Sequence, residues 1–151
     1  AVGRHAGYQR ALEQAGIAYD ETLVRFGSGS TPDGYTHALD LMTLDDPPTA
    51  IFCANDRTAW GAYQALAELG LSVPGDVSVV GFDNQDIIAG FLRPGLTTMN
   101  LPFREMGWAA VDLLLRGAAE RTVESEGRRS LLVRCELVTR GSVAAPKGMK
   151  Q

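Results

Sequence analysis

The sequence lacks several features that would mark whole classes of protein. No stretch of its 151 residues approaches the roughly 18 to 20 consecutive apolar residues that cross a bilayer, and the segment from Ala1 to Leu12 has no apolar signal-peptide core. We therefore expect no membrane association and a cytoplasmic protein. With 14 Lys and Arg against 18 Asp and Glu, the net charge is −4, and the basic residues are scattered. Because no basic stripe can follow a phosphate backbone, these residues should not hold nucleic acid by themselves.

Residues suited to covalent or metal chemistry are also scarce. The two cysteines, Cys53 and Cys135, lie within apolar runs, which favours buried, inert thiols over a disulfide or a metal site. His5 and His37 have no nucleophile or metal ligand beside them. Residues 27–34, "GSGSTPDG", lack the spacing and the Lys of phosphate-binding glycine loops. The sequence therefore predicts a protein that is not an enzyme and that carries no cofactor or metal.

Helical and strand patterns alternate along the chain. Apolar residues at helical spacing predict helices over the first dozen residues, Tyr35 to Met42, Asp56 to Leu69, and Pro102 to Arg116. Strand patterns cover Thr22 to Phe26, Thr49 to Ala54, Val77 to Phe82, and Leu131 to Val138. The two middle strands are apolar on successive residues, so both of their faces should be buried. Such strands in alternation with helices predict an α/β protein with a doubly wound parallel sheet.

Polar side chains follow both of these apolar strands. Asn55 and Asp56 come after the first, and Asp83 and Asn84 come after the second. Because ligands of open α/β sheets bind beyond the carboxyl ends of the strands, these residues are candidate ligand contacts. Asp56 also stands where a helix begins, and there a carboxylate caps free N–H groups and favours the positive end of the helix dipole. The pattern favours capping for Asp56 and ligand contact for Asn55.

Asp83 and Arg4 complete the candidate set. A carboxylate at the mouth of a buried strand must be solvated, paired or ligand-bound, although Asp83 could also form an Asx turn. Arg4 lies at the start of a helix, where a cation opposes the dipole, so it is either a solvated surface residue or has another use. One Arg fork, one Asn amide and one carboxylate together suit a small polyhydroxylated or heterocyclic ligand.

Four motifs follow one another along the chain. They are "RHAGYQRALEQAGI", "PPTAIFCANDRTAWGAYQALAELGLSVPGDVSVVGFDN", "RPGLTTMNLPFREMGWAAVDLLL" and "CELVTRGSV". Together they resemble the carboxyl-terminal part of the effector-binding core of the lactose-repressor (LacI/GalR) family, over nearly all of residues 3–143. The resemblance implies a periplasmic-binding-protein-like fold of two α/β lobes with an effector in the cleft. It also implies a helix-turn-helix headpiece, which this chain does not contain.

The resemblance implies roles for individual residues. Arg4, Asn55 and Asp83 match the positions of the effector ligands in the family's motifs, and the effector would be a sugar or a purine-like molecule. Gly29 stands about where the family often has an aromatic that packs on the effector. Stacking from this loop would therefore be lost in this protein.

The resemblance also implies a division of the chain into parts. Residues 1–96 would form the carboxyl-terminal, effector-binding lobe. Residues 97–132 would hold the crossover segment and a helix of an incomplete amino-terminal lobe, and residues 133–151 the return strand and tail. The helix from Pro102 to Arg116 would then lack the usual cover of its apolar face.

Trp60, on the helix that begins at Asp56, needs a separate explanation. Ala62 and Leu66 belong to the core stripe of that helix, whereas Trp60 and Tyr63 fall on another face. An aromatic patch off the core face suggests a subunit interface, and in the family this helix lies at the dimer contact. Burial under a neighbouring loop is the alternative. We expect a homodimer with Trp60 and Tyr63 in the interface and Phe91 beside them.

The sequence as a whole favours the effector-binding and dimerisation part of a DNA-binding transcriptional repressor that responds to a small molecule. Operator DNA would be bound only through the headpiece outside this chain. The alternative is a periplasmic sugar-binding protein of a transport system, which shares the fold and the motifs around Asn55 and Asp83. The segments "LSVPGDVSVVGFDN" and "LTTMNLPFREMG" favour the regulator. An enzyme built on the same kind of sheet is a third alternative.

Overall fold

The computed structural model describes residues 2–119 and 133–146. Its elements, in chain order, are α1 (Val2–Gln14), the 3-10 helix η1 (Glu21–Leu23), α2 (Thr31–Met42), β1 (Ala50–Phe52), α3 (Asp56–Glu68), β2 (Ser78–Asp83), α4 (Asp86–Ala89), β3 (Thr97–Asn100), α5 (Phe103–Ala119) and β4 (Leu137–Val138). The predicted helices α1, α2, α3 and α5 and the predicted strands β1 and β2 are confirmed, with shifts of up to about four residues at their ends. The expectation that both faces of β1 are buried is wrong, because Ala50 and Phe52 of this strand are exposed. Within these ranges no helix combines the length and the apolar character needed to cross a membrane.

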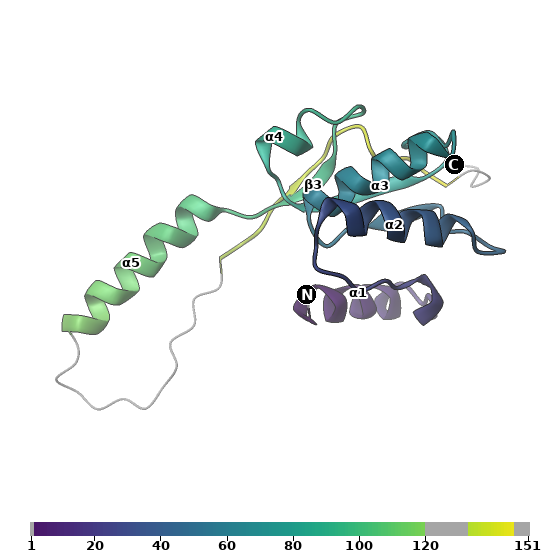
Figure 1. Cartoon of the computed structure of the whole chain (residues 1–151). Coiled ribbons are helices and arrows are strands. Elements are labelled where there is room, and N and C mark those ends of the chain that lie inside the picture. Colours follow the sequence, from purple (N-terminus) through teal and green to yellow (C-terminus); the bar gives the residue numbers. More distant parts are fainter. Residues whose placement is uncertain (1, 120–132, 147–151) are drawn as a thin grey trace.

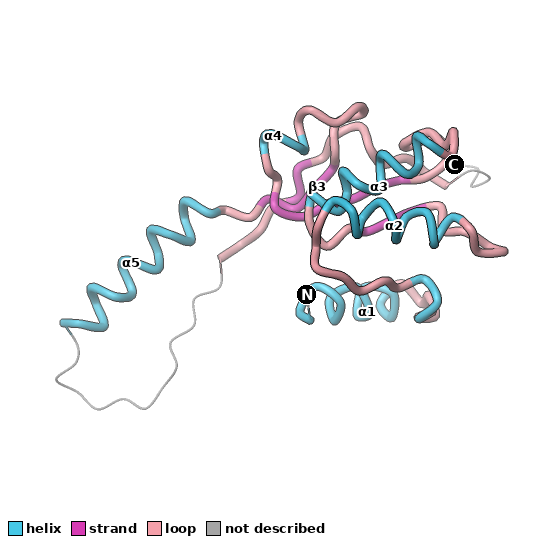
Figure 2. Tube along the Cα trace, viewed as in Figure 1, coloured by secondary structure: helices cyan, strands magenta, loops and turns pink. Residues whose placement is uncertain are grey.

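The strands form one sheet in the order β1-β2-β3-β4, seen as the magenta segments near the centre of Figure 2. β1 pairs with β2, and β2 with β3, in parallel, while β4 joins β3 in the antiparallel direction. Helix α3 is the crossover between β1 and β2, which parallel neighbours require. The predicted α/β fold is confirmed, with one antiparallel strand at the edge.

Helices lie on both faces of this sheet. Successive residues of a strand point to opposite faces, and in β2 a Cβ atom on Gly81 would meet the carboxylate of Asp56, the first residue of α3. Phe82 therefore points to the other face. There the guanidinium of Arg4, from α1, lies 3.9 Å from the centre of the Phe82 ring. The alternation places α3 on one face of the sheet and the start of α1 on the other.

The hydrophobic core lies on the α3 face. Its buried members come mainly from α2, α3 and β2 and from the residues that flank the strands: Ala38, Cys53, Ala59, Ala62, Tyr63, Ala65, Leu66, Val77, Val79, Ala89 and Leu96. Of the predicted core stripe of α3, Ala62 and Leu66 are buried, whereas Leu69, just after the helix, is 45% exposed. The stripe therefore ends one turn earlier than the apolar pattern of the sequence.

Two glycines allow α2 and α3 to lie directly against each other. A methyl group on Gly34 of α2 would overlap the carbonyl of Thr58, and a methyl group on Gly61 of α3 would overlap the carbonyl of Thr31. The two helix backbones therefore touch without side chains between them. This contact fixes the position of α3 over the sheet.

The opposite face of the sheet has less cover. None of the described side chains of α1 is buried, and Phe52 of β1 is 44% exposed.

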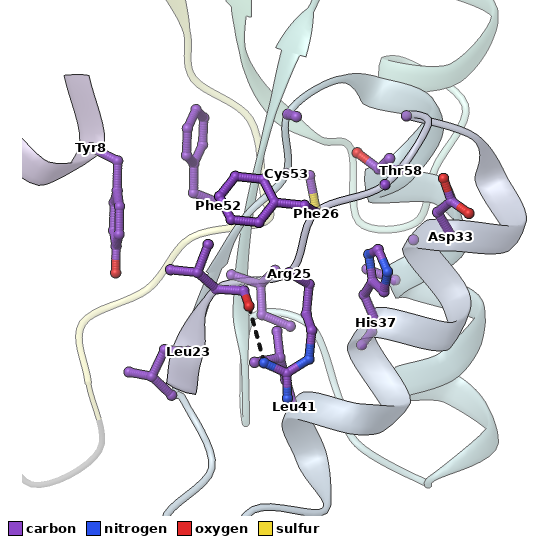
Figure 3. Close-up of a pocket in the computed structure, with 18 of the residues that line it drawn as sticks. Tyr8, Leu23, Arg25, Phe26, Asp33, His37, Leu41, Phe52, Cys53 and Thr58 are labelled. Atoms are coloured by element: carbon purple, nitrogen blue, oxygen red, sulfur yellow. Dashed lines mark hydrogen bonds between the residues drawn. The ribbon is translucent and has the colours of Figure 1, made fainter. Parts of the chain in front are cut away.

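The predicted strand from Thr22 to Phe26 is wrong, because the 3-10 helix η1 includes Thr22 and Leu23, and residues 24–26 pair with no described strand. A cavity of about 240 Å³, drawn in Figure 3, is lined by residues 23–27 on one side and by β1 on the other. A strand needs a neighbour to pair with, and this segment has none among the described residues.

Helix α5 extends away from the rest of the described chain, as Figure 1 shows. Most of its large apolar side chains are exposed: Phe103, Met106, Trp108, Val111, Leu114 and Leu115. The expectation that this helix lacks cover for its apolar face is confirmed. The return strand is shorter than predicted, since β4 spans only Leu137–Val138, and residues 131–132 of the predicted strand lie outside the described residues.

The contact between α2 and α3 can be tested with paired glycine substitutions. Gly61→Ala should lower the free energy of unfolding by about 3 kcal/mol, because the new methyl group meets backbone that cannot move aside. Gly7→Ala is the matched control, since a Cβ atom at that position of α1 meets no atom within 4 Å. There the better helix propensity of Ala should stabilise by up to about 1 kcal/mol. Urea denaturation measures both, and equal effects would contradict the close contact.

Candidate functional site

Helix α3 begins just beyond the end of β1, and Asn55 is its N-cap. The Asn55 side-chain oxygen accepts a hydrogen bond of 2.8 Å from the N–H of Thr58, and the Asn55 N–H donates to Thr58 Oγ1 at 3.3 Å. The two bonds form a capping box. The Asn55 amide nitrogen also donates to the Gly29 carbonyl at 2.9 Å. Asn55 therefore joins the loop before α2 to the start of α3, and its second amide hydrogen has no hydrogen-bond acceptor among the described residues.

Asp56 begins α3 as predicted, but the prediction that it caps the helix is wrong because Asn55 does so. The Asp56 side chain is fully buried instead. Its Oδ1 accepts from Thr98 Oγ1 at 2.6 Å, and its Oδ2 accepts from the N–H of Gln85 at 2.7 Å. Burial raises the pKa of Asp56, and these two hydrogen bonds oppose the rise. One carboxylate thus ties the start of α3 to β3 and to the turn after β2.

Arg4 and Asp83 meet at the carboxyl edge of the sheet. Arg4 Nη2 lies 3.4 Å from Asp83 Oδ1, and Arg4 Nη1 donates to the carbonyl of Ala54 at 2.6 Å. Since Ala54 follows β1 and Asp83 ends β2, the guanidinium bridges the ends of the two strands. The structure therefore brings Arg4, Asn55 and Asp83 to one edge of the sheet, as the sequence predicted. Their contact with a ligand stays a prediction.

The backbone is strained where β2 ends. The φ angle is +111° at Asp83 and +56° at Asn84, a region that residues with a side chain rarely adopt, although Asn tolerates it better than most. The Asx-turn alternative for Asp83 does not hold, because the N–H of Gln85, which such a turn would use, donates to Asp56. The surrounding structure must hold such strain in place, and it often marks functional sites.

Arg140 supports this turn, and sequence reasoning did not find it. Its guanidinium donates to the carbonyl of Leu96 and to Asn84 Oδ1, each at 2.8 Å. Asn84 also donates to Asn100 Oδ1 at 3.1 Å. Arg140 and Asn84 are 56 positions apart in the chain, so no local spacing could have revealed the contact. The pairing of β3 with β4, together with the hydrogen bonds of Ser142 to Thr97 and Val79, brings the carboxyl-terminal segment to this side of the site.

The arrangement at the sheet edge suits a ligand with several hydroxyl groups. The side chains of Arg4 and Asp83 are 33% and 14% exposed, so a ligand can reach both. A hydroxyl group can donate to the carboxylate of Asp83 while its neighbour accepts from Arg4 or from the Asn55 amide. Within residues 2–119 and 133–146, no three His, Cys, Asp or Glu side chains are grouped as metal ligands.

The cysteines and histidines of the chain differ in their surroundings. Cys53 is buried, which raises the pKa of its thiol to about 12, so the thiol stays protonated at neutral pH. Both cysteines are free thiols, although Cys135 is only partly buried. His5 lies with its Nε2 atom 3.1 Å from the hydroxyl of Tyr19, and His37 lines the cavity of Figure 3.

The aromatic residues expected at a dimer interface differ in exposure. Trp60 is 44% exposed and Phe91 is 74% exposed, so both are free to contact a partner. Tyr63 is only 8% exposed, and its hydroxyl donates to the carbonyl of Pro94 at 3.0 Å. For Tyr63 the expectation of an exposed interface residue is wrong and the alternative of burial under a neighbouring loop holds, because the loop around Pro94 covers this side chain.

Gly29 has a local structural reason to lack a side chain. Its φ angle is +82°, and a Cβ atom there would lie 2.9 Å from the amide nitrogen of Asn55. An aromatic at this position would be strained and would displace the hydrogen bond from Asn55 to the Gly29 carbonyl. In this protein the loop binds the helix cap and provides no stacking surface from position 29.

The chain is similar to known proteins over nearly its whole length. The family model of the periplasmic binding protein-like domain matches residues 1–143. The HTH-type transcriptional repressor PurR of Histophilus somni is 36% identical over 143 residues, which are 95% of this chain and 42% of that protein. The chain therefore spans about two fifths of the length of this relative.

Two solved structures share the fold over almost the whole chain. The complex of the transcriptional regulator CelR with cellobiose superposes with a TM-score of 0.83 and 34% identity, over 93% of this chain and 42% of that one. The Lac repressor bound to ONPG in its repressed state gives a TM-score of 0.81 and 32% identity, over 93% of this chain and 40% of that one.

The buried Asp56 carboxylate predicts a specific pH dependence. Because burial raises the pKa of Asp56 in the folded state, the contribution of this group to stability is complete below its unfolded pKa and is lost as pH rises through the folded pKa. The free energy of unfolding of the wild type minus that of Asp56→Asn should therefore fall as pH rises from about 3.5. Urea titrations of the wild type and of Asp56→Asn at several pH values measure this difference. A difference that rises with pH would contradict the raised pKa.

Proposed function

The chain belongs to the periplasmic binding protein-like domain family, and from this membership we propose that it is the carboxyl-terminal part of the effector-binding core of a transcriptional repressor of the LacI type. The effector is a small molecule, and we propose a sugar. The observation that carries this proposal is the contact of Arg4 with both Asp83 and the carbonyl next to Asn55. It creates one patch of donors and acceptors at the edge of the sheet where ligands of such folds bind.

A sugar fits this patch better than a ligand with few hydroxyl groups. Asp83 has two carboxylate oxygens, of which Oδ1 faces Arg4 and Oδ2 accepts from the Gln85 side chain at 3.2 Å. Each oxygen can accept from a further hydroxyl, and the Arg4 fork can donate to a neighbouring one. The solved relatives include one complex with cellobiose and one with ONPG, which supports a sugar. A purine-like effector is the competing outcome of a ligand screen.

The regulator is favoured over a transport protein because the relatives in these comparisons are repressors and transcription regulators. We propose that the chain itself is not an enzyme, in line with those relatives and with the protonated, buried thiol of Cys53. Operator DNA would be contacted by a part of the protein outside this chain. A cytoplasmic location follows from that role.

We propose that the protein acts as a homodimer through α3 and α4. Helices α3 and α4 are in contact. Each carries exposed apolar side chains: Trp60 on α3, Ile87 on α4, and Phe91 just after α4. A buried Trp often dominates an interface. The exposed apolar side chains of α5 would be covered in the complete protein by the other lobe, to which we assign this helix.

The effector proposal is tested first by substitution of Asp83. Asp83→Ala should weaken sugar binding by about 1.5 to 3 kcal/mol, roughly ten- to more than a hundredfold, because a charged hydrogen-bond acceptor is lost. A thermal-shift screen over sugars and purines identifies the ligand, since a ligand at about 100 times its Kd adds about 2.7 kcal/mol of stability. Isothermal titration calorimetry then compares wild type and variant.

The matched control is Asp86→Ala. Asp86 lies three positions further along, is exposed, and is not the N-cap of α4, which is Gln85. It should leave both the affinity and the melting temperature unchanged. If Asp83→Ala lowers the melting temperature but binds sugars with wild-type affinity, Asp83 serves the turn and the proposed effector site is withdrawn.

The dimer proposal is tested by Trp60→Ala. Truncation of an interface Trp commonly costs about 2 kcal/mol or more, so the variant should sediment as a monomer at micromolar concentration where the wild type is a dimer. Trp108→Ala on α5 is the control, because Trp108 is 74% exposed and lies outside the proposed interface. A mass that changes only in Trp108→Ala would place the interface on α5 instead.

A further inference from the structure

The strained turn at Asp83 and Asn84 is held from two sides by side chains distant in sequence. On one side, Asp56 accepts the N–H of Gln85 at 2.7 Å. On the other side, the guanidinium of Arg140 donates to Asn84 Oδ1 at 2.8 Å. The φ angle of +111° at Asp83 lies in a region that a residue with a side chain keeps only when its surroundings hold it, whereas +56° at Asn84 is a value that Asn tolerates. The position of the Asp83 carboxylate therefore depends on these contacts.

Arg140 is itself firmly placed. Its backbone N–H donates to Thr97 Oγ1 at 2.9 Å, and its Nη1 atom donates to the carbonyl of Leu96 at 2.8 Å. These two bonds fix both ends of the residue on β3 and on the segment before it. The second arm of the guanidinium, Nη2, is then directed to Asn84. The planar fork of Arg makes such a two-armed contact, which the single ammonium of Lys cannot copy.

The same turn contacts the segment that leads to α5, and this segment in turn contacts the returning one. The N–H of Leu101, just after β3, donates to the carbonyl of Asp83 at 3.3 Å, and the Asn84 amide donates to Asn100 Oδ1 at 3.1 Å. The N–H of Asn100 in turn donates at 2.7 Å to the carbonyl of Glu136, on the returning segment. A change in the conformation of the turn would therefore alter the hydrogen bonds of Asn100 and Leu101, where the chain leaves the sheet for α5.

We propose that Arg140 is a positioning residue of the effector site, which acts through the side chain of Asn84 to hold the Asp83 carboxylate and to link it to the segment between β3 and α5. This role rests on the proposed function of Asp83, Arg4 and Asn55. Arg140 does not contact the ligand. Removal of the Arg140 side chain leaves the Asp83 carboxylate in the molecule but releases the turn that holds this carboxylate in position.

The first test needs no ligand and follows amide hydrogen exchange by NMR in the 151-residue chain. Arg140→Gln keeps the backbone bond to Thr97 but loses the two guanidinium arms. The amides of Gln85 and Leu101 should then exchange about tenfold faster or more, because they bond across the released turn. The amide of Cys53, bonded to Val80 at 2.8 Å between β1 and β2, should keep its rate. Equal acceleration of all three amides would mean a general loss of stability and would overturn the proposal.

Arg93→Gln is the matched control. Arg93 also donates from one guanidinium nitrogen to two backbone carbonyls, those of Gly90 and Leu92, each at 2.9 Å, but it has no bond to Asn84. It should leave the exchange of Gln85 and Leu101 unchanged. If Arg93→Gln accelerates these amides as much as Arg140→Gln does, the effect is not specific to Arg140 and the proposal fails.

A double substitution tests whether Arg140 acts through Asn84. Asn84→Gly keeps a φ angle of +56° accessible while it removes the side chain that Arg140 holds. In that background Arg140→Gln should change the exchange of Gln85 by less than about twofold, because the shared contact is already lost. Fully additive effects would show that Arg140 acts on the turn by another route, against the proposal.

The second readout is affinity, with cellobiose as the first probe and calorimetry as the method. Arg140→Gln should weaken cellobiose binding about tenfold while its melting temperature stays close to that of the wild type. Wild-type affinity in a variant whose turn exchanges faster would overturn the positioning role. If the wild type binds neither cellobiose nor any other sugar of the screen, the sugar assignment fails, and the exchange experiments alone decide whether Arg140 holds the turn.

Discussion

The buried carboxylate of Asp56 is the contact on which the geometry of the sheet edge depends. It stands at the first turn of α3, and it accepts hydrogen bonds from Thr98 in β3 and from Gln85 after β2. A buried carboxylate is costly unless its oxygens are satisfied, so neither bond can be given up without a large loss of stability. The ends of β1, β2 and β3 consequently hold fixed relative positions. The positions of Arg4 and Asp83, whose contact spans the ends of β1 and β2, are fixed as a result.

This contact also decides what Asp83 can do. The N–H of Gln85 is bound to Asp56, so it does not close a turn with Asp83. The Asp83 carboxylate therefore faces Arg4 and the solvent, and the backbone accepts a positive φ angle to place it there. The strain is borne by a well-packed layer on the α3 face, where Gly34 and Gly61 let two helices meet. Rigid packing on one face thus supports a polar edge at the end of the strands.

Cover of the apolar surfaces is uneven within the described residues, and an α/β layer buries its apolar faces only against further layers. The face of the sheet beside α1 is sparsely covered, Phe52 of the edge strand β1 is exposed, and α5 has no described neighbour along its apolar face. The α3 face, by contrast, carries the buried hydrophobic core.

The sequence by itself determined the elements whose signal is local. The continuous apolar runs of β1 and β2 and the periodic stripe of α3 were sufficient to predict an α/β sheet, and the polar residues after those strands were sufficient to place the site at its carboxyl edge. Tertiary structure alone decided the rest. Residues 22–26 have a strand pattern but no partner strand, Tyr63 is buried by a loop thirty-one positions away, and Arg140 reaches the turn from the far end of the chain. Periodicity reports which face of an element is apolar, whereas pairing, burial of a carboxylate and support of a strained turn depend on what the fold brings against that face.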